Sequence, residues 1–343
     1  MSKLLKVLTG ETVSPSPIWM MRQAGRHLPE YRAVRETTTS FIDFCFSPEK
    51  AAEVTLQPVD RYDMDAAILF ADILLIPIGL GRDVNFVKGV GPVLEPITVN
   101  DIKHLRIEGA AERISSVFET VSLVRKQLSP DKALIGFCGG PWTVATYMLE
   151  GKGTTSKEVA KRFAYQNPKA MDDLLEALVV SSADYLICQA KAGANVLKIF
   201  ESWAQGLSPL MFQKLVIQPT VDIIERVRSA GVDVPIIGFP RASGLNMSAF
   251  LKQVTIQGIA ASTDVSLTEL RKLTGPRLAI QGNLDPLALR IGGEVLRAAV
   301  EHVISSSTGP HIFNLGHGVS PDVKIKNIHA VVDHLRTGEG DYI

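Results

Sequence analysis

The chain has 343 residues, which is long enough for one large α/β domain or two average domains. Its 36 lysine and arginine residues balance 36 aspartate and glutamate residues, so the formal net charge at pH 7 is zero. A neutral chain has no overall field that would attract nucleic acid or an anionic membrane, and any site for anions must therefore be local.

Positive charge is concentrated in the first 35 residues, which contain only two acidic residues, Glu11 and Glu30. The basic residues of this segment are Lys3, Lys6, Arg22, Arg26, Arg32 and Arg35. This is the one marked charge asymmetry in the chain. It indicates that the protein binds a small acidic ligand.

Arg22 and Arg26 are the candidate ligand-binding residues of this segment. On a helix they would share one face, where like charges four residues apart repel, and an anion between them would relieve the repulsion. Guanidinium groups match the paired oxygens of carboxylates, so a ligand with several carboxylates fits best. The alternative is a solvated helix face on which Arg26 pairs with Glu30 and Arg32 pairs with Glu36.

The cysteine pattern and the hydropathy favour a cytoplasmic protein. Cys45, Cys138 and Cys188 are far apart and form no CxxC motif, which is typical of reduced thiols. The N-terminus lacks the apolar core that we would expect of a secretory signal. The most apolar stretch, residues 66–81, contains Asp72 and is shorter than the roughly 20 residues of a membrane-spanning helix.

A short apolar run followed by a helical segment recurs eight times along the chain. Such runs are typical of strands that are buried on both faces of a parallel sheet. They cover residues 18–21, 66–70, 133–137, 196–200, 234–239, 259–263, 278–281 and 311–315. The alternation predicts a single (β/α)8 barrel over residues 1–343, and not a doubly wound sheet, because no GxGxxG motif follows the first run.

The segments between the runs contain helix-start signals. These are Ser47–Pro48, Asn167–Pro168, Asp285–Pro286 and the capping box Ser266 to Glu269. Gly275 is a predicted helix stop. The loops at 79–92 and 151–156 are expected to pass over the mouth of the barrel, where long loops often carry function.

The barrel prediction brings distant residues together, because active sites of such barrels lie at the carboxyl ends of the strands. Polar residues after strands are ordinary turn residues, but several of these are charged. Those that follow the eight runs are Arg22, Asp72, Gly139 to Pro141, Glu201 and Ser202, Arg241, Asp264, Asn283 and His317.

The sequence lacks the motifs of several common kinds of active site. The chain contains no HExxH motif, no CxxC pair and no P-loop, so neither a structural zinc nor a cradled nucleotide phosphate is expected. Lys198 lies inside the fourth run and could form a Schiff base. The alternative for Lys198 is a strand lysine that pairs with an acid such as Glu201.

Seven stretches of the chain resemble the uroporphyrinogen decarboxylase family. The two longest are PIWMMRQAGRHLPEYR at 17–32 and IGFCGGPWTVATYMLEG at 135–151. The others are VTLQP at 54–58, AAILFADILLIP at 66–77, IFESWAQGLSP at 199–209, AIQGNLDP at 279–286 and FNLGHGVSPD at 313–322. Together they span nearly the whole chain.

The resemblance implies a cytosolic, homodimeric barrel enzyme of haem synthesis that needs no cofactor. Such a carboxy-lyase converts uroporphyrinogen III to coproporphyrinogen III by removing four acetate carboxyl groups as CO2. The eight carboxylates of this substrate fit a locally basic mouth. Without a cofactor, the electrons left by decarboxylation need a sink, and a protonated pyrrole of the substrate can accept them.

Asp72 is the predicted catalytic residue, because it matches the position of the family's essential aspartate. Facing the inward pyrrole N–H groups, its carboxylate would accept several hydrogen bonds, remain ionised and stabilise the cation. The alternative is a buried aspartate that caps a turn. Water, Tyr147 and a transiently protonated Asp72 remain open as proton donors.

The same matching predicts the residues that bind substrate carboxylates. The side chains are Arg22, Gln23, Arg26, Tyr147, Ser202 and His317, with the backbone of Ala24 and Gly25 close by. The glycines beside His317 would leave its ring room to reach a ligand.

The chain departs from the family pattern at a few positions, and two other functions stay open. His27, Gln205 and Cys138 replace an aromatic, a glycine and a small residue, and Ala260–Ala261 replaces an Asp–Trp pair, which puts the contribution of the sixth strand in question. A zinc-dependent corrinoid methyltransferase would need an HxC pair and a late cysteine, but no cysteine follows Cys188. A tetrapyrrole carrier is the non-enzymatic alternative.

Overall fold

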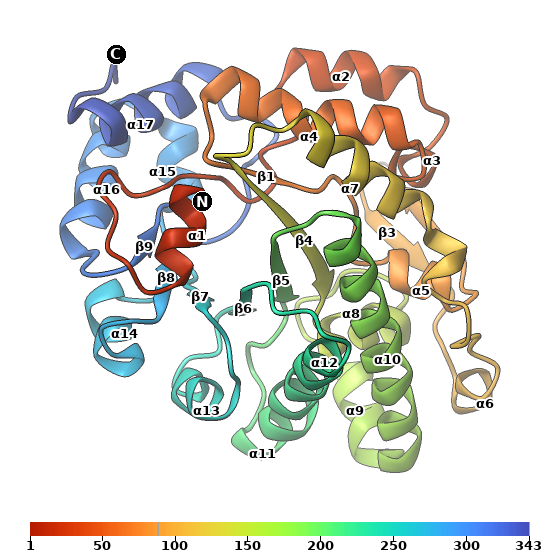
Figure 1. Cartoon of the computed structure of the whole chain (residues 1–343). Helices are drawn as coiled ribbons and strands as arrows, with labels where there is room; N and C mark the ends of the chain where they lie inside the picture. The colour runs from red at the N-terminus through yellow and green to blue at the C-terminus, as the bar shows by residue number, and fades with distance from the viewer. Residues whose placement is uncertain (88, 343) are drawn as a thin grey trace.

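The fold is a seven-stranded parallel sheet with helices arranged around it (Figure 1). The computed structural model describes residues 1–87 and 89–342. The strands follow one another across the sheet in the order of the chain. They are β1 (Ala66–Ile68), β4 (Ala133–Gly139), β5 (Val196–Glu201), β6 (Ile236–Pro240), β7 (Gly258–Ala260), β8 (Ala279–Gln281) and β9 (His311–Ile312). The predicted α/β class and parallel sheet are confirmed.

The helices are long where they cover the strands and short where they form turns. In the described residues they are α1 (Lys3–Leu8), α2 (Pro29–Glu36), α3 (Phe41–Cys45), α4 (Pro48–Tyr62), α5 (Leu75–Gly79), α6 (Val99–Ile102), α7 (Ser116–Gln127), α8 (Pro141–Glu150), α9 (Glu158–Gln166), α10 (Pro168–Ala192), α11 (Pro209–Phe212), α12 (Gln218–Ser229), α13 (Asn246–Gln253), α14 (Leu267–Thr274), α15 (Pro286–Ile291), α16 (Gly293–Ser306) and α17 (Ile325–Thr337), with the 3-10 helix η1 (Glu112–Ile114) and the π-helix η2 (Gln213–Ile217). None of those in the described part is long and apolar enough to cross a bilayer.

The predicted helix starts are confirmed, with one difference in capping. Helices α4, α10 and α15 begin at the predicted prolines. Proline suits this position because it has no N–H, and the first N–H of a helix has no partner within the helix. The Ser266 hydroxyl accepts a hydrogen bond from the Glu269 N–H at 3.3 Å. The Glu269 carboxylate pairs with Lys272 instead of returning to the cap, so only half of the predicted capping box forms.

The first predicted strand, residues 18–21, is replaced by a single bridge. Ile18 pairs in parallel with Phe313, just after β9, and its carbonyl accepts a hydrogen bond from the Asp65 N–H, just before β1, at 2.8 Å. The segment therefore connects the two edge strands of the sheet. The pairing of this segment does not extend beyond the single bridge, because the chain turns at Arg22, where φ is +63°.

The two predicted loop excursions pack against each other. Residues 84–87 and 91–94 form the antiparallel hairpin β2 (Val84–Val87) and β3 (Gly91–Leu94). Val93 bridges to Lys152, and the Leu94 N–H donates to the Gly151 carbonyl at 2.8 Å. Phe86 and Pro92 of the hairpin line the cavity described below, so the first excursion lies at its mouth and the second packs against the first.

Candidate active site

A cavity of about 480 Å³ lies at the carboxyl ends of β1, β4 and β5. Most of the residues predicted to bind substrate line it, although they come from distant parts of the chain. They are Arg22, Ala24, Gly25, Arg26, Asp72, Tyr147, Ser202 and His317. The structure thus brings together eight of the nine predicted site residues in one place.

Gln23 is the ninth, and its side chain does not reach the cavity. It is 1% exposed, its Oε1 accepts from the Met20 N–H and its Nε2 donates to the Ala66 carbonyl, both at 3.0 Å. These bonds attach the segment before Arg22 to the start of β1. Gln23 therefore holds the arginine segment in place, and its side-chain amide is not free to bind substrate.

The arginine segment is a turn and not the predicted helix. Arg22 adopts a left-handed conformation, and helix α2 begins only at Pro29. The Met21 N–H donates to Asn314 Oδ1 at 3.0 Å, which fixes the turn against the chain after β9. Both arginines are exposed at the cavity, and in the part of the chain that the structure describes neither forms an ion pair.

The alternative pairing predicted for these arginines is wrong. Glu30 pairs with Arg61 through two hydrogen bonds of 2.6 and 2.9 Å, and not with Arg26. Arg32 donates to the carbonyl oxygens of Arg26 and His27. The arginines at the cavity are therefore not neutralised by the neighbouring helix, because the acid of that helix is engaged elsewhere.

Gly318 allows Arg22 to lie across the GHG motif. A Cβ at position 318 would lie 2.5 Å from the Arg22 Cδ. Gly316 has a different role, since its Cβ would lie 2.3 Å from the backbone nitrogen of Thr263. The glycines beside His317 therefore make room for these neighbours, and the predicted room for the His317 ring is not their main effect.

Asp72 lies just past the end of β1, at the edge of the apolar part of the cavity. The Leu74 N–H donates to its Oδ1 at 2.8 Å, so the predicted turn-capping bond is present as well. Burial raises the pKa of Asp72, while this hydrogen bond and the charge of Arg22 act in the opposite direction. Burial in this cavity therefore disfavours the ionised form of the Asp72 carboxyl group.

The neutral groups of the cavity are Tyr147, Ser202 and His317. Burial, and the nearby Asp72, raise the pKa of Tyr147 to about 12, so its hydroxyl stays protonated. Burial, together with Arg241 and Arg22, lowers the pKa of His317 to about 4. His317 is therefore uncharged at neutral pH and can interact with a carboxylate only as a hydrogen-bond donor.

Several residues at the strand ends do not line the cavity. Asn283 donates to the carbonyls of Ser262 and Val265, and Arg241 donates to the Ser202 carbonyl at 3.2 Å. Asp264 accepts from the Ser262 hydroxyl at 2.5 Å. None of the cavity-lining residues comes from β7, which ends at Ala260, so the sixth predicted strand contributes no lining side chain.

The predicted pair of Lys198 and Glu201 is absent. The Lys198 Nζ is fully buried and lies 4.8 to 5.2 Å from the ring centres of Trp19, Phe200 and Phe239, and no hydrogen-bond partner is found for it among the described residues. Burial lowers the pKa of this amine well below its ordinary value. Glu201 is bonded elsewhere, at the start of α8.

Sequence reasoning missed the aromatic wall of the cavity. The rings that line it include Tyr31, Phe41, Phe70, Phe86, Phe137 and Phe200. Phe41 and Phe86 pack at 4.4 Å between ring centres, which ties α3 to the β2–β3 hairpin. An apolar wall of aromatic rings facing basic residues suits a ring-shaped polyacid. The phenylalanines of the wall are spread along the chain from 41 to 200, so no local pattern marked it.

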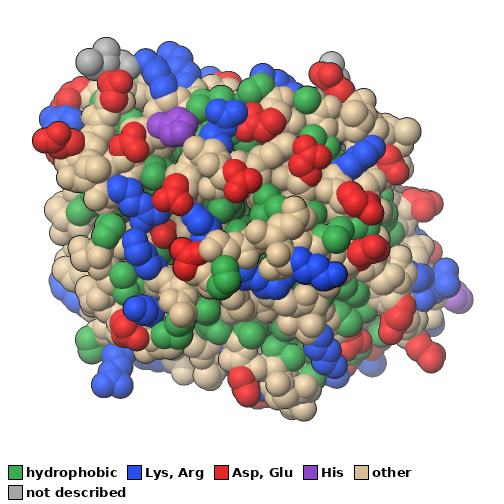
Figure 2. All heavy atoms as spheres, turned by 45° about the horizontal axis from the view of Figure 1, so that its top comes forward, with side chains coloured by type: hydrophobic (Ala, Val, Ile, Leu, Met, Phe, Trp, Pro, Cys, Tyr) green, Lys and Arg blue, Asp and Glu red, His purple; other side chains and the backbone are tan. Residues whose placement is uncertain are grey.

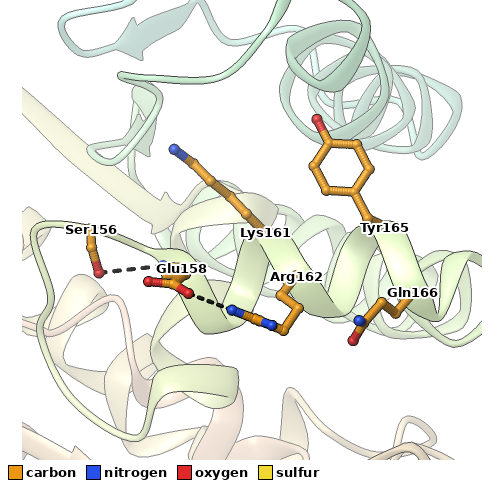
Figure 3. Close-up of a pocket in the computed structure, with 6 residues that line it drawn as sticks. All are labelled: Ser156, Glu158, Lys161, Arg162, Tyr165 and Gln166. Atoms are coloured by element: carbon orange, nitrogen blue, oxygen red, sulfur yellow. Dashed lines mark hydrogen bonds and ion pairs between the residues drawn. The ribbon is translucent and has the colours of Figure 1, made fainter.

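Two other surface features do not add to this site. A hollow on α9 is lined by Ser156, Glu158, Lys161, Arg162, Tyr165 and Gln166 (Figure 3). There Glu158 pairs with Arg162, and Lys161 donates to the Gly206 carbonyl at 2.7 Å. On the face shown in Figure 2, basic and acidic side chains are interspersed, as expected of a neutral chain.

Metal ligands do not gather in the described residues. Within 1–87 and 89–342, no three His, Cys, Asp or Glu side chains are placed so that they could hold a metal ion together. The charged groups facing the cavity are the two arginines and Asp72. The fold and the site together define an α/β protein whose cavity offers arginines to an anionic ligand.

Comparison with known proteins identifies the family. The chain belongs to the uroporphyrinogen decarboxylase family, whose model matches residues 1–338. Proteins named uroporphyrinogen decarboxylase from Phenylobacterium zucineum and Caulobacter vibrioides are 51% and 50% identical, covering 97% and 98% of this chain and 96% and 95% of theirs. The family is one of carboxy-lyases, so the enzyme class predicted from the sequence is confirmed.

Similar solved structures confirm the fold but do not distinguish functions. A methyltransferase from Methanosarcina mazei superposes with a TM-score of 0.76 at 18% identity, covering 97% of both chains. A B12-independent methionine synthase from Shewanella sp. gives a TM-score of 0.54 at 12% identity, covering 85% of this chain and 86% of its own. The decarboxylase assignment therefore depends on the sequence relatives and not on the shared fold.

Proposed function

We propose that this chain removes the four acetate carboxyl groups of uroporphyrinogen III as CO2 and forms coproporphyrinogen III. The observation that carries the proposal is the placement of one carboxyl group, Asp72, in an aromatic cavity whose mouth holds two arginines without ion-pair partners among the described residues. This arrangement matches a macrocycle with acidic groups on its rim and N–H groups at its centre.

The proposed binding mode divides the ligand between rim and centre. Arg22 and Arg26 bind acetate or propionate carboxylates as charged donors. The hydroxyls of Tyr147 and Ser202 and the neutral ring of His317 donate further hydrogen bonds. The apolar body of the macrocycle packs on the aromatic wall, and its pyrrole N–H groups donate to Asp72.

In the proposed reaction, the substrate supplies its own electron acceptor. A pyrrole ring takes up a proton and becomes a cation, which the ionised Asp72 stabilises across a short, desolvated distance. The bond between the acetate CH2 and its carboxyl carbon then breaks, CO2 leaves, and the electron pair moves into the pyrrole ring. A second proton adds to the exposed CH2 carbon to give a methyl group, while the ring loses the first proton.

The shifted acidities favour Asp72 over Tyr147 as the group that delivers the first proton. Burial raises the pKa of both groups, to about 12 for Tyr147, and a carboxyl group is intrinsically the stronger acid of the two. After the transfer, the ionised Asp72 accepts hydrogen bonds from the pyrrole N–H groups, and these bonds stabilise the ionised form of Asp72.

We further propose that residues 1–343 form one closed (β/α)8 barrel domain that acts as a cytoplasmic homodimer. The bridge from Ile18 to Phe313 and the bond from Asp65 to Ile18 support closure, because they place an eighth segment between the edge strands. Leu210 of α11 and Leu245, in the turn after β6, are 77% and 97% exposed, and they offer apolar surface to a second copy. Light scattering of the purified protein tests the dimer.

The decisive experiment is incubation with uroporphyrinogen III under anaerobic, reducing conditions without added metal or coenzyme, followed by chromatography of the oxidised products. We expect successive loss of carboxyl groups, ending in the tetracarboxylic product. Unchanged substrate that co-purifies with the protein would indicate a carrier. Turnover that depends on an added metal or coenzyme would contradict the proposed electron sink.

A further inference from the structure

Glu201 is a buried carboxyl group that the reaction proposed above does not use. It is the last residue of β5, its side chain is 1% exposed, and no cation forms an ion pair with it within the described residues. A buried carboxyl without a cation costs stability unless hydrogen bonds compensate. Its partners therefore show why this position holds an acid.

Three donors at the start of α8 point at the two oxygens of Glu201. The Thr143 N–H donates to Oε1 at 2.8 Å, the Thr143 hydroxyl donates to the same oxygen, and the Trp142 N–H donates to Oε2 at 3.2 Å. The N-terminal N–H groups of a helix have no partners within the helix, so the carboxyl group caps α8 from a neighbouring strand. A Cβ at position 140 would lie 2.2 Å from Oε2, which explains the glycine there.

The same hydrogen-bond network extends to Trp203. The Trp203 N–H donates to the Thr143 hydroxyl oxygen, and the Trp142 Nε1–H donates to the Trp203 carbonyl, both at 3.1 Å. The Trp203 ring stacks on Tyr147 with 4.1 Å between ring centres and 24° between ring planes. One acid therefore connects the chain on both sides of Ser202 with the helix that carries Tyr147.

We propose that Glu201 is a positioning residue that fixes the hydroxyls of Ser202 and Tyr147 relative to each other at the cavity. The inference rests on the proposed function, because it assigns those hydroxyls to substrate carboxylates. The carboxyl group of Glu201 does not touch the substrate. It sets the separation of two neutral donors that a macrocycle must meet at the same time.

The first test compares Thr143→Val with Thr143→Ser and Thr146→Val. Thr143→Val removes the hydroxyl that connects Glu201 with Trp203, whereas Thr143→Ser keeps it. Thr146→Val removes a buried hydroxyl of the same helix that donates only to the Trp142 carbonyl at 2.7 Å. We expect Thr143→Val to raise KM for uroporphyrinogen about tenfold over both controls with kcat within about twofold, because ground-state and transition-state binding weaken equally.

The second test is a double-mutant cycle. Glu201→Gln keeps one acceptor oxygen but presents an NH2 group to the helix N–H groups, and we expect it to raise KM about tenfold as well. In a Ser202→Ala, Tyr147→Phe background the same change should cost less than about twofold, because the hydroxyls that it positions are gone. An equal cost in both backgrounds would overturn the proposal.

A substrate-free measurement separates this inference from the proposed function. Two of the three tryptophans of the chain, Trp142 and Trp203, belong to the network, so near-ultraviolet circular dichroism reports on it directly. We expect Thr143→Val to change this spectrum and Thr146→Val to leave it unchanged. If wild-type protein lacks decarboxylase activity but the spectra behave as expected, the proposed function fails and the network stands. If Thr143→Val matches Thr146→Val in both spectrum and KM, the positioning role is wrong, and this holds even if Glu201→Gln does not fold.

Discussion

Two sides of the cavity offer hydrogen-bond donors to a ligand in opposite ways. On one side, Arg22 and Arg26 lie on an exposed turn, and neither forms an ion pair within the described residues. On the other side, Ser202 and Tyr147 are neutral and are attached to a buried, fully bonded network around Glu201. The arginines are charged and exposed at the cavity, whereas the hydroxyls are neutral and belong to segments that this network joins.

This difference suits a substrate whose charge falls during turnover. Uroporphyrinogen would enter with eight carboxylates and leave with four, so the charged side must accept several charge patterns. Long, unpaired guanidinium groups can do this, because each can bind whichever carboxylate remains nearby. On the proposed binding mode, the hydroxyl side would keep the ring in register with Asp72 while the rim changes.

The largest effect is expected for Asp72→Asn, which removes the charge between the two sides. We expect kcat to fall about 10³-fold, because an amide cannot stabilise the pyrrole cation, while substrate affinity changes little. Quenching of intrinsic fluorescence by uroporphyrinogen measures binding, and product chromatography measures turnover. Asp264→Asn, which removes an exposed carboxylate at the end of β7, is the control. Wild-type turnover in Asp72→Asn would exclude this aspartate from the reaction.

Asp72→Asn should also stabilise the protein. Burial raises the pKa of Asp72, so the ionised form is disfavoured in the folded state and the group lowers the free energy of unfolding at pH values above its ordinary pKa. Replacing it with a neutral amide should therefore raise the denaturation midpoint in urea at pH 7. A lower midpoint would indicate that Asp72 is a structural cap of its turn through the bond from Leu74.

On the arginine side, KM should depend on the charge of Arg22 and on the ionic strength. Arg22→Gln is expected to raise KM by about ten- to a hundredfold, because a charged hydrogen bond to a carboxylate contributes about 1.5–3 kcal/mol. The wild-type KM should also rise with ionic strength, and the slope should be smaller in the variant. Arg162→Gln is the control, since Arg162 is paired with Glu158 on α9 (Figure 3). Equal salt dependence in all three proteins would exclude a charge contact at Arg22.

A smaller effect on the same side is expected from Gly318→Ala. Its Cβ would lie 2.5 Å from the Arg22 Cδ, so the arginine must move although no charge is lost. We expect KM to rise about three- to tenfold with little change in unfolding free energy. Gly153→Ala, where the nearest side-chain atoms lie 4.0 Å away, is the control. An unchanged KM in Gly318→Ala would show that the position of Arg22 is not critical.

The last prediction separates the two sides of the cavity by the pH dependence of protein stability. Burial raises the pKa of Glu201 from 4.5 to about 8, although the bonds from Thr143 and Trp142 lower it. The folded state therefore holds this proton more tightly than the unfolded state, and the stability that the proton contributes is lost as pH rises from 4.5 towards 8. Urea denaturation across this range should show a steeper decline for wild type than for Glu201→Gln. Arg22→Gln should follow wild type, and parallel curves for all three proteins would contradict the assignment.

Most of the architecture could be predicted because buried parallel strands leave a clear pattern. Seven of the eight predicted runs form strands, and the prolines at 48, 168 and 286 start helices as expected. The run at 18–21 could not be recognised as a single bridge. Its apolar pattern is strand-like, but the left-handed turn at Arg22 depends on bonds to Asn314 at the other end of the chain.

The structure brings most of the predicted site residues to one cavity, and their roles stay predictions. Motif resemblance placed eight residues at one cavity, but Gln23 faces the interior, because its amide satisfies backbone groups that no local pattern reveals. The ion pairs were wrong for a similar reason. Spacing favours Arg26 for Glu30, yet Arg61 of α4 reaches it with two hydrogen bonds. Contacts between segments decided these outcomes.

The bond between Met21 and Asn314 spans 293 residues of sequence, and it helps to hold the arginine turn. A ribosome releases the N-terminal arginines first and their anchor almost last, so the nascent chain can bind no polyacid at this place until synthesis is nearly complete. Contacts between such distant residues also form slowly. The mouth therefore assembles late in synthesis, and chains that end before residue 314 would carry Asp72 without the hydrogen bond that holds the arginine turn.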